Sequence, residues 1–469
     1  MKISYKTSLL IIALLLSFSL HAQKAWTLQE CIQYALENNL NIKQQSLTIE
    51  RDVNQLEQSK WAMAPTISAS ADYSFSWGRT PNAQDFTIIE NQLTQTGYGR
   101  IGANLDIFRG LQKVNTVKSN KAQLEISGQE VEKLKNDISI QIARTYLEVL
   151  LAQEMLETTK QSRQSVSEQA SRTQKLVDAG NLAHSSLLEM EAQLATEQVQ
   201  VVNAENTLRT SYLGLIQLLD LSHETDFRIA VPQIQVDTLG FLGASVDQLY
   251  QFSQSLPQIQ IGEFTLQQRE YQLAATKGQR YPSLSLSAGI STSYSPPVSS
   301  SGSGSIPGLE PDPDNPLSGT DIPMASTPTD FFGLINSRKS PSIGISISIP
   351  ILSGRTVATN IRNAHLGVQQ AQIDMKNRQQ ALYKEIQQAN NDAISAFERY
   401  KATTQNVRSM EESFRYVQQK LDVGLLNGTD FTVAKTSLFR AQSDNLQAKY
   451  QYVFQLKILD FYKGVPITL

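Results

Sequence analysis

The chain has 469 residues, of which 40% are hydrophobic, and its formal charge at pH 7 is −3. This hydrophobic fraction is too low for a protein that crosses a membrane with many helices, and the small charge argues against a basic nucleic-acid binder. The single cysteine, Cys31, excludes an intrachain disulfide framework and a cysteine-cluster metal site. Four scattered histidines make a histidine-based metal or catalytic site a poor hypothesis.

The N-terminus has the three parts of a secretory signal peptide. Two lysines precede an apolar run over residues 8–20, and the tripeptide at residues 20–22 resembles a cleavage site. The run is shorter than the roughly 17–25 residues of a membrane-spanning helix, so an uncleaved anchor is the weaker alternative. We therefore expect residues 1–22 to be removed. Because no cysteine stands at the cleavage point, we expect no lipid attachment.

The spacing of proline predicts two long helical hairpins. No proline lies between Pro81 and Pro232 or between Pro350 and Pro466, and proline breaks helix interiors. Both intervals are rich in Gln, Ala, Glu, Lys and Leu, which favour helices. The expected hairpins cover 111–219, with a first helix over 113–179, and 354–463, with a return from Asp430 to Lys463. Their turns fall at Gly180 and Gly424, and shorter helices are expected over 28–60 and 246–277.

Four segments alternate apolar and polar residues with a period of two, as strands with one apolar face do. They are Thr66–Trp77, Arg100–Ile107, Ser283–Tyr294 and Ser342–Ile351. We expect them to form β-hairpins at 66–108 and 283–351. Each strand has the roughly 10 residues that cross a membrane at a tilt, although half-exposed soluble hairpins have the same pattern.

A long loop is expected within the second hairpin. Residues 291–330 hold eight of the 16 prolines, many Ser and Gly, and neither Lys nor Arg. Such a composition does not build a core and is typical of a flexible surface loop.

Four strands are too few to close a barrel in a membrane. The smallest membrane barrels have about eight strands, and an open edge leaves backbone groups unpaired in lipid. Several chains must therefore share one barrel if these strands enter a bilayer. Three chains would leave an opening, which suits the Ser, Gly, Thr, Asn and Asp of the polar face.

The chain also repeats itself. Pro65 and Pro282 stand in similar contexts 217 residues apart, and the glycines at 110 and 354 stand 244 apart. The turn glycines of the two helical hairpins keep the same offset of 244. We therefore expect two structural repeats, 23–245 and 246–469, with residues 220–245 as a linker at the end of the first.

With these features the sequence resembles the TolC-like outer-membrane efflux proteins, from about residue 26 to residue 463. The matching motifs are Trp26-Thr-Leu-Gln-Glu-Cys-Ile-Gln-Tyr-Ala-Leu-Glu-Asn-Asn-Leu40, Ala64-Pro65, Tyr281-Pro282, Ile349-Pro-Ile-Leu-Ser-Gly-Arg355, Ala179-Gly180 and Val423-Gly424. The resemblance implies an α+β membrane protein whose antiparallel helical hairpins form an α-barrel. Its two β-hairpins would contribute four strands to a shared 12-stranded barrel of a homotrimer.

The same resemblance implies function and partners. The protein is expected to be an exit duct in the outer membrane of a Gram-negative bacterium, passing small molecules or secreted polypeptides. Its expected partners are outer-membrane lipid, a periplasmic adaptor of the membrane-fusion type and an inner-membrane pump of the RND or ABC type. No nucleic acid, cofactor, metal or catalytic residue is expected. A periplasmic coiled-coil adaptor is the alternative, although it lacks duplicated amphipathic β-hairpins.

The resemblance also implies where functional residues lie, since in this family the helix turns form the periplasmic entrance and contact the adaptor. An acidic residue often stands six positions after the turn glycine. The expected entrance residues are Gly180, Ser186, Asp422, Gly424 and Asp430. The expected adaptor contacts are Gly180, Asn181, Gly424 and Leu425. Asp430 matches the acidic pattern, Ser186 departs from it, and helix capping is an alternative role for Asp430.

Aromatic side chains are expected at the membrane interface, although an ordinary core would also use them. They are Tyr73, Phe75, Trp77, Tyr98 and Tyr294. Two enzyme-like readings are weak. Asp422 and Asp430 stand eight residues apart across a turn, without a defined geometry for acid–base work. His184 with Glu189 and Glu191 is better explained as a solvated helix face than as a metal site, and Cys31 is expected to be buried.

Overall fold

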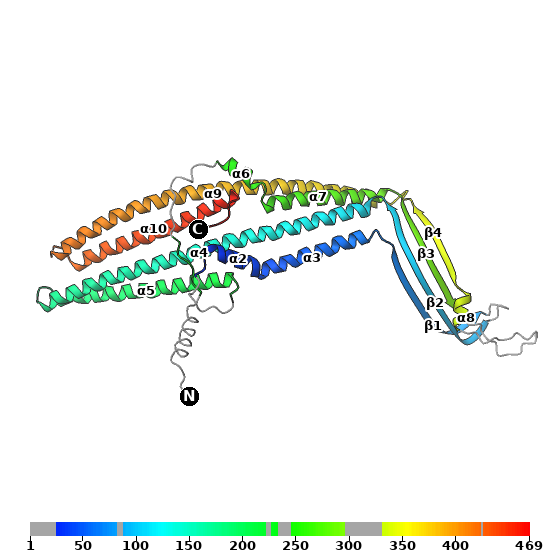
Figure 1. The fold of residues 1–469 in the computed structure, drawn as a ribbon, viewed down its shortest axis with the longest axis horizontal. Coiled ribbons are helices and arrows are strands. Elements are labelled where there is room, and N and C mark those ends of the chain that lie inside the picture. Colours follow the sequence, from blue (N-terminus) through cyan, green and yellow to red (C-terminus); the bar gives the residue numbers. More distant parts are fainter. Residues whose placement is uncertain (1–24, 82–87, 222–226, 233–244, 296–330, 424) are drawn as a thin grey trace, which may run out of the picture. The chain divides into compact units, whose positions relative to one another are not determined.

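The computed structural model describes residues 25–81, 88–221, 227–232, 245–295, 331–423 and 425–469 (Figure 1). Its contacts define two compact units. The helical unit lies within residues 1–52, 123–266 and 370–469, and the sheet unit within 53–122 and 267–369. The expected signal peptide, and most of the expected loop at 291–330, lie outside the described residues. The expected start of that loop is wrong, because residues 291–294 pair with a neighbouring strand and continue the third strand.

The sheet unit contains one antiparallel sheet with the strand order β1-β2-β3-β4 (Figure 1). The strands are β1 Thr66–Pro81, β2 Ile88–Arg109, β3 Ser283–Tyr294 and β4 Ser340–Ser348. All four predicted strands are therefore confirmed, but the expected end of the last one at Ile351 is wrong. That strand stops at Ser348 because Pro350 has no backbone N–H to donate to a neighbouring strand.

The register gives the sheet one apolar and one polar face, because residues directly opposite each other share a face. Ile67, Ala103, Ala288 and Ile343 form one row across the four strands. The next row is Ser68, Gly102, Gly289 and Ser342, and it lies on the other face. Among the described residues, β1 and β4 each pair with a single strand, so each has an open edge.

The helices repeat the same order in both halves of the chain. They are α2 Leu28–Asn38, α3 Leu40–Trp61, α4 Gln112–Asp178, α5 His184–Leu218, α6 Val246–Ser253, α7 Pro257–Lys277, α8 Phe331–Ser337, α9 Thr356–Asp422 and α10 Gly428–Tyr462, with a 3-10 turn at Gly278–Arg280. The long helices α4 and α9 both have 67 residues, and α5 and α10 both have 35. Helix α8, between β3 and β4, was not expected from the sequence.

The two shorter helices expected at 28–60 and 246–277 are each broken in two. The first break is at Asn39, whose side-chain oxygen accepts from the backbone N–H of Asn41 at 2.9 Å and of Ile42 at 3.4 Å. Asn39 therefore caps the start of α3. The second break precedes Pro257, the first residue of α7, where the missing N–H costs nothing. The signal for both breaks was present in the sequence as an Asn and a Pro.

A buried cluster holds the helical unit together. Tyr146 of α4 is almost fully buried, and its hydroxyl donates to the carbonyls of Ala230 at 2.6 Å and Trp26 at 3.1 Å. These carbonyls belong to two extended segments that meet at a bridge between Trp26 and Ile229. Cys31 lies in the same cluster and is fully buried, which confirms the prediction. Burial raises the pKa of its thiol to about 12.

Two glycines allow a close backbone approach in the sheet unit. Gly110 joins β2 to α4 with a φ of +58°, and Gly278 joins α7 to the start of β3. A Cβ on Gly110 would overlap the carbonyl of Gly278, and a Cβ on Gly278 would overlap the carbonyl of Gly110. The contact brings together the strand–helix junctions of the two repeats.

We predict that Gly278→Ala destabilises the protein, because the added methyl group meets backbone that cannot move aside. The expected cost is about 1–3 kcal/mol, the usual range for overpacking. The matched control is Gly367→Ala in α9, where nothing lies within 4 Å of the new Cβ. That control should be neutral or more stable by roughly 0.5–1 kcal/mol, because alanine favours helices. Thermal unfolding followed by circular dichroism checks both; equal melting temperatures would contradict the prediction.

Candidate functional site

The turn between α4 and α5 closes with a standard glycine cap. Gly180 has a φ of +77°, which favours glycine. Its N–H donates to the carbonyl of Val177 at 2.9 Å, and the N–H of Asn181 donates to that of Leu176 at 2.8 Å. Ser186 lies in the first turn of α5, a helix without a side-chain cap at its start. The turn therefore carries neither a cap nor a carboxylate at this position.

The turn between α9 and α10 has the same backbone hydrogen bond as the turn between α4 and α5, but the helix that follows it begins differently. The N–H of Leu425 donates to the carbonyl of Lys420 at 2.9 Å, which matches the bond from Asn181 to Leu176 in the first repeat. Gly424 lies outside the described residues, and the side chain of Asp422 is also not described. Both stay predictions as entrance residues.

Asp430 takes part in a capping box at the start of α10. The side chain of Asn427 accepts from the N–H of Asp430 at 2.9 Å, and the N–H of Asn427 donates to a carboxylate oxygen of Asp430 at 3.4 Å. The expected alternative role of Asp430 in helix capping is therefore confirmed. Its partner Asn427 was missed, although the spacing Asn-x-x-Asp is a signal for such a box. Both side chains remain exposed.

Apolar side chains are exposed at both turns. Leu425 is 72% exposed and Val423 is 69% exposed. In the first repeat Asn181 replaces the leucine, but the next residue, Leu182, is 41% exposed. Sequence reasoning missed Leu182 because it considered only the position directly after the glycine. Each turn therefore offers an exposed leucine to a partner.

The start of α10 packs against α5 within the helical unit. A Cβ on Gly428 would lie 3.0 Å from the terminal methyl of Met190, which is buried on α5. Within the second hairpin, Phe431 is also buried and lies 5.4 Å, between ring centroids, from Phe414 of α9. The absence of a side chain at Gly428 thus allows the two hairpins to approach closely near their turns.

A buried polar cluster joins α10 to the first hairpin. The ammonium of Lys435 donates to the backbone carbonyl of Ser162, and the hydroxyl of Ser162 donates to Glu197 at 2.8 Å. All three residues are buried, which is rare for Lys and Glu unless they have partners. Burial lowers the pKa of Lys435 to about 8, against the opposing effect of Glu197 and Glu168. No sequence pattern predicted this cluster, because its members are far apart in the chain.

A second ionic contact links the same helices. Lys449 and Tyr450 of α10 both donate to a carboxylate oxygen of Glu154 on α4, at 2.9 and 2.7 Å. Tyr450 is buried, so this contact is shielded from water on one side. Together with Lys435, it provides polar links between the second hairpin and the first.

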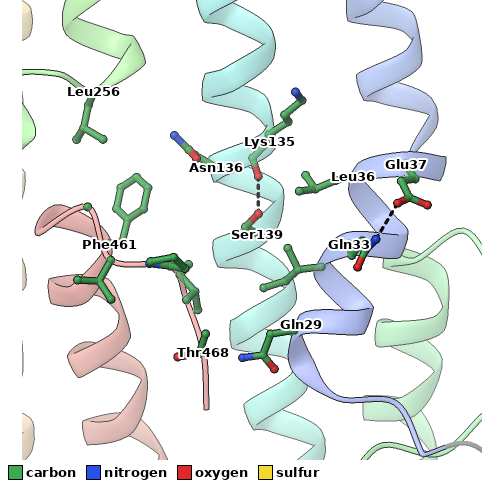
Figure 2. A pocket seen from close by; sticks show the side chains of 15 residues that line it. Gln29, Gln33, Leu36, Glu37, Lys135, Asn136, Ser139, Leu256, Phe461 and Thr468 are labelled. Atoms are coloured by element: carbon green, nitrogen blue, oxygen red, sulfur yellow. Dashed lines mark hydrogen bonds between the residues drawn. The ribbon is translucent and has the colours of Figure 1, made fainter.

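Figure 2 shows a pocket of about 670 Å³ in the helical unit, between α2, α4 and the C-terminal residues that follow α10. Its wall includes Leu36 and Phe461. Two charged side chains that line the pocket each interact with a neighbour on the same helix. Glu37 accepts from Gln33 at 3.0 Å, and Lys135 pairs with Glu132 at 2.7 Å.

The aromatic residues expected at the membrane interface divide between the two faces of the sheet. Phe75 stands 5.2 Å from Tyr73 and 6.3 Å from Trp77, and Tyr294 stands 6.1 Å from Tyr73, between ring centroids. These four lie on the apolar face. Tyr98 does not join them, because it pairs with Asp72 and belongs to the polar face. The period-two alternation along β2 already indicates that Tyr98 lies on the polar face.

The enzyme-like readings find no support in the described part of the chain. There, no group of three His, Cys, Asp or Glu side chains comes together as a metal site would require. His184 is the first residue of α5, and Glu189 and Glu191 follow on the same helix.

Among the helices that the structure describes, none is both long enough and apolar enough to cross a membrane.

Two long helical hairpins and a two-faced, four-stranded sheet with open edges define the class, that of outer-membrane efflux channels. The family model described as outer membrane efflux protein matches residues 31–220 and 249–464, and the chain belongs to this family. The predicted resemblance is confirmed, and so is the fold class.

The relatives and solved structures agree with this assignment. The proteases secretion protein PrtF of Dickeya chrysanthemi is 19% identical over 94% of this chain and 89% of its own length. The outer membrane protein TolC of Escherichia coli K12 is 21% identical over 96% of this chain and 84% of its own length. The crystal structure of the Campylobacter jejuni CmeC outer membrane channel superposes with a TM-score of 0.73 at 17% identity. The match covers 93% of this chain and 85% of the CmeC chain. They indicate an outer-membrane efflux or secretion channel of the TolC type, and the family is one of channel proteins rather than enzymes.

We predict that the buried Lys435 makes stability depend on pH. An unfolded lysine keeps its proton up to about pH 10.5, whereas in the fold the pKa is about 8. Below pH 8 the side chain is charged in both states, so the cost of burying the charge is fully present. Between pH 8 and 10.5 the folded state loses the proton first, so the stability of the wild type should rise with pH.

The measurement is the melting temperature of the wild type minus that of Lys435→Met, which cancels the other titrating groups. This difference should be constant below pH 8 and increase above it. Lys401→Met, which removes an exposed lysine of α9, is the control and should show no such increase. A difference for Lys435→Met that stays flat up to pH 10.5 would show that the lysine is not buried in the assembled protein.

Proposed function

We propose that this protein is the outer-membrane exit duct of a tripartite export machine and that three copies build one channel. The observation that carries the proposal is the sheet with one apolar face, one hydroxyl-rich face and two open edges. An open edge in lipid leaves N–H and C=O groups unpaired at a cost of several kcal/mol each. A single chain therefore cannot place this sheet in a bilayer.

The strand order supports closure by identical copies. The four strands alternate in direction, so β4 of one copy and β1 of the next run antiparallel when they meet. Three copies would supply twelve strands with no edge left over. The apolar face would then contact lipid, and the polar face would line a lumen that twelve strands leave open.

The helical unit supports a periplasmic role. Its hairpins α4–α5 and α9–α10 are too long for a compact domain and are joined by buried polar contacts such as Lys435 with Ser162. We propose that the turns contact a periplasmic adaptor through Gly180, Asn181, Gly424 and Leu425, and that the adaptor connects the channel to an inner-membrane pump of the RND or ABC type. The exposed Leu182 and Leu425 support this surface.

The same proposal includes the cargo, the location of the protein and the roles of the two repeats. Small toxic molecules and secreted polypeptides are both compatible with a wide, hydroxyl-lined lumen, and the name of PrtF refers to protease secretion. The mature protein would lie in the outer membrane of a Gram-negative bacterium after loss of residues 1–22, without a lipid anchor. The repeats 23–245 and 246–469 would each supply one β-hairpin and one helical hairpin, and residues 291–330 would face the cell exterior.

The test is the mass of the protein extracted from membranes in detergent. We expect three copies per particle and flotation with outer membrane that survives a carbonate wash. A soluble adaptor protein would be released by that wash. A monomer that stays stable in the membrane fraction would overturn the shared barrel, because its sheet would then tolerate open edges.

We further propose that the Asp430 carboxylates, one from each chain, form a ring at the periplasmic entrance beside Ser186, Asp422 and the turn glycines. The exposure of Asp430 supports this role, and the capping box is compatible with it because it uses one carboxylate oxygen. Negative charges that converge favour cations. Asp430→Asn removes the charge and keeps an acceptor for the N–H of Asn427, so it should lower cation selectivity without loss of the trimer.

The reversal potential in a planar bilayer with a salt gradient measures this selectivity. Glu411→Gln, which removes an exposed carboxylate from α9, is the control and should leave the reversal potential nearly unchanged. If Asp430→Asn has the reversal potential of the wild type, Asp430 is only a capping residue.

A further inference from the structure

The apolar face of the sheet has a hollow of about 510 Å³. Its floor is formed by small residues that meet across two strands, Ala69, Ala71 and Gly99. Larger side chains, Ile101 and Ile290, stand at one end. Since neighbouring positions on this face carry Tyr73, Phe75 and Trp77, the small residues leave a groove in an otherwise bulky apolar surface.

Helix α8 lies over the same face beside the groove. The ring of Phe331 is 4.8 Å from that of Tyr294, between centroids, and the hydroxyl of Thr292 donates to the carbonyl of Ile335 at 2.7 Å. Thr292 and Tyr294 both belong to the apolar face of β3. A second, smaller hollow of about 230 Å³ lies between these residues and α8. The helix is thus attached to the face that a membrane would cover.

Two cations follow α8, and one of them, Lys339, reaches the groove. Lys339 lines the hollow together with Ala71 and Ile290, and its ammonium donates to the side-chain oxygen of Asn336 at 2.6 Å. Arg338 precedes it and is exposed. A lysine on an apolar, membrane-facing surface lays its methylene stem along that surface and keeps its charge at the level of polar headgroups. The neighbouring aromatic residues are of the kind that gathers at this level.

We propose that this groove binds an anionic lipid of the outer leaflet, with an acyl chain over Ala69, Ala71 and Gly99 and a phosphate beside Arg338 and Lys339. The inference rests on the proposed function, because it requires the apolar face of the sheet to lie in the bilayer. Charge selects the ligand. Lys339 at the edge of an apolar groove, with the exposed Arg338 next to it in the chain, matches a phosphate attached to hydrocarbon, whereas a neutral or zwitterionic lipid gains less from these cations.

The experiment uses the full-length mature channel in nanodiscs made of equal parts phosphatidylglycerol and phosphatidylcholine. Native mass spectrometry then measures how much of each lipid stays on the released protein. We expect the wild type to retain mainly phosphatidylglycerol. Arg338→Gln and Lys339→Gln should each reduce the ratio of the two retained lipids by about fivefold, the effect expected for one cation near a charged surface. The control Lys401→Gln removes an exposed cation of the helical unit and should keep the ratio of the wild type.

A second variant tests the groove itself. Ala71→Leu fills the hollow with an apolar side chain and should lower retention of both lipids without changing their ratio. The inference is overturned if the wild type retains both lipids equally, or if Lys339→Gln keeps the ratio of the wild type. The mass of the protein separates the two proposals. A trimer without lipid preference overturns the groove alone, whereas a monomer overturns the shared barrel and the groove with it.

Discussion

Backbone hydrogen bonding at the edges of the sheet is the constraint on which the rest of this protein depends. A strand at an edge presents a row of N–H and C=O groups that water can satisfy but lipid cannot. The part of the chain that the structure describes supplies four strands and leaves β1 and β4 open. In the proposed channel, identical copies satisfy both edges at once, since each copy provides the edge that the next one lacks. For a sheet placed in lipid, the chemistry of the backbone thus calls for an oligomer before any side chain is considered.

The two repeats differ in how their return helices begin. Both turns use the same backbone bond, from Asn181 to Leu176 and from Leu425 to Lys420, because any helix reversal must satisfy its last carbonyls. Only the second repeat begins its return helix with a capping box, at Asn427 and Asp430. The carboxylate of Asp430 therefore has no counterpart at the matching position of the first repeat, where Ser186 stands.

Polar groups link the hairpins of the helical unit where apolar packing alone would allow many registers. A buried lysine needs a partner, and Lys435 finds one in the carbonyl of Ser162, whose hydroxyl in turn donates to Glu197. The sheet unit instead depends on missing side chains, because the backbones at Gly110 and Gly278 come so close that neither position has room for a Cβ. Any change in how the helices pack must exchange these buried bonds for others.

Local periodicity in the sequence by itself determined most of the elements. The alternation of Ile67 to Trp77 and of Ile343 to Ile347 predicted strands with two faces, and the absence of proline predicted α4 and α9. The same alternation, applied to Tyr98, would have placed it on the polar face. Tertiary structure alone decided the pairing of β2 with β3, the contact of Gly110 with Gly278 and the burial of Lys435. These contacts join residues more than a hundred positions apart. A pattern along the chain predicts the local element and the face on which a residue lies, but it does not predict which distant element packs against that face.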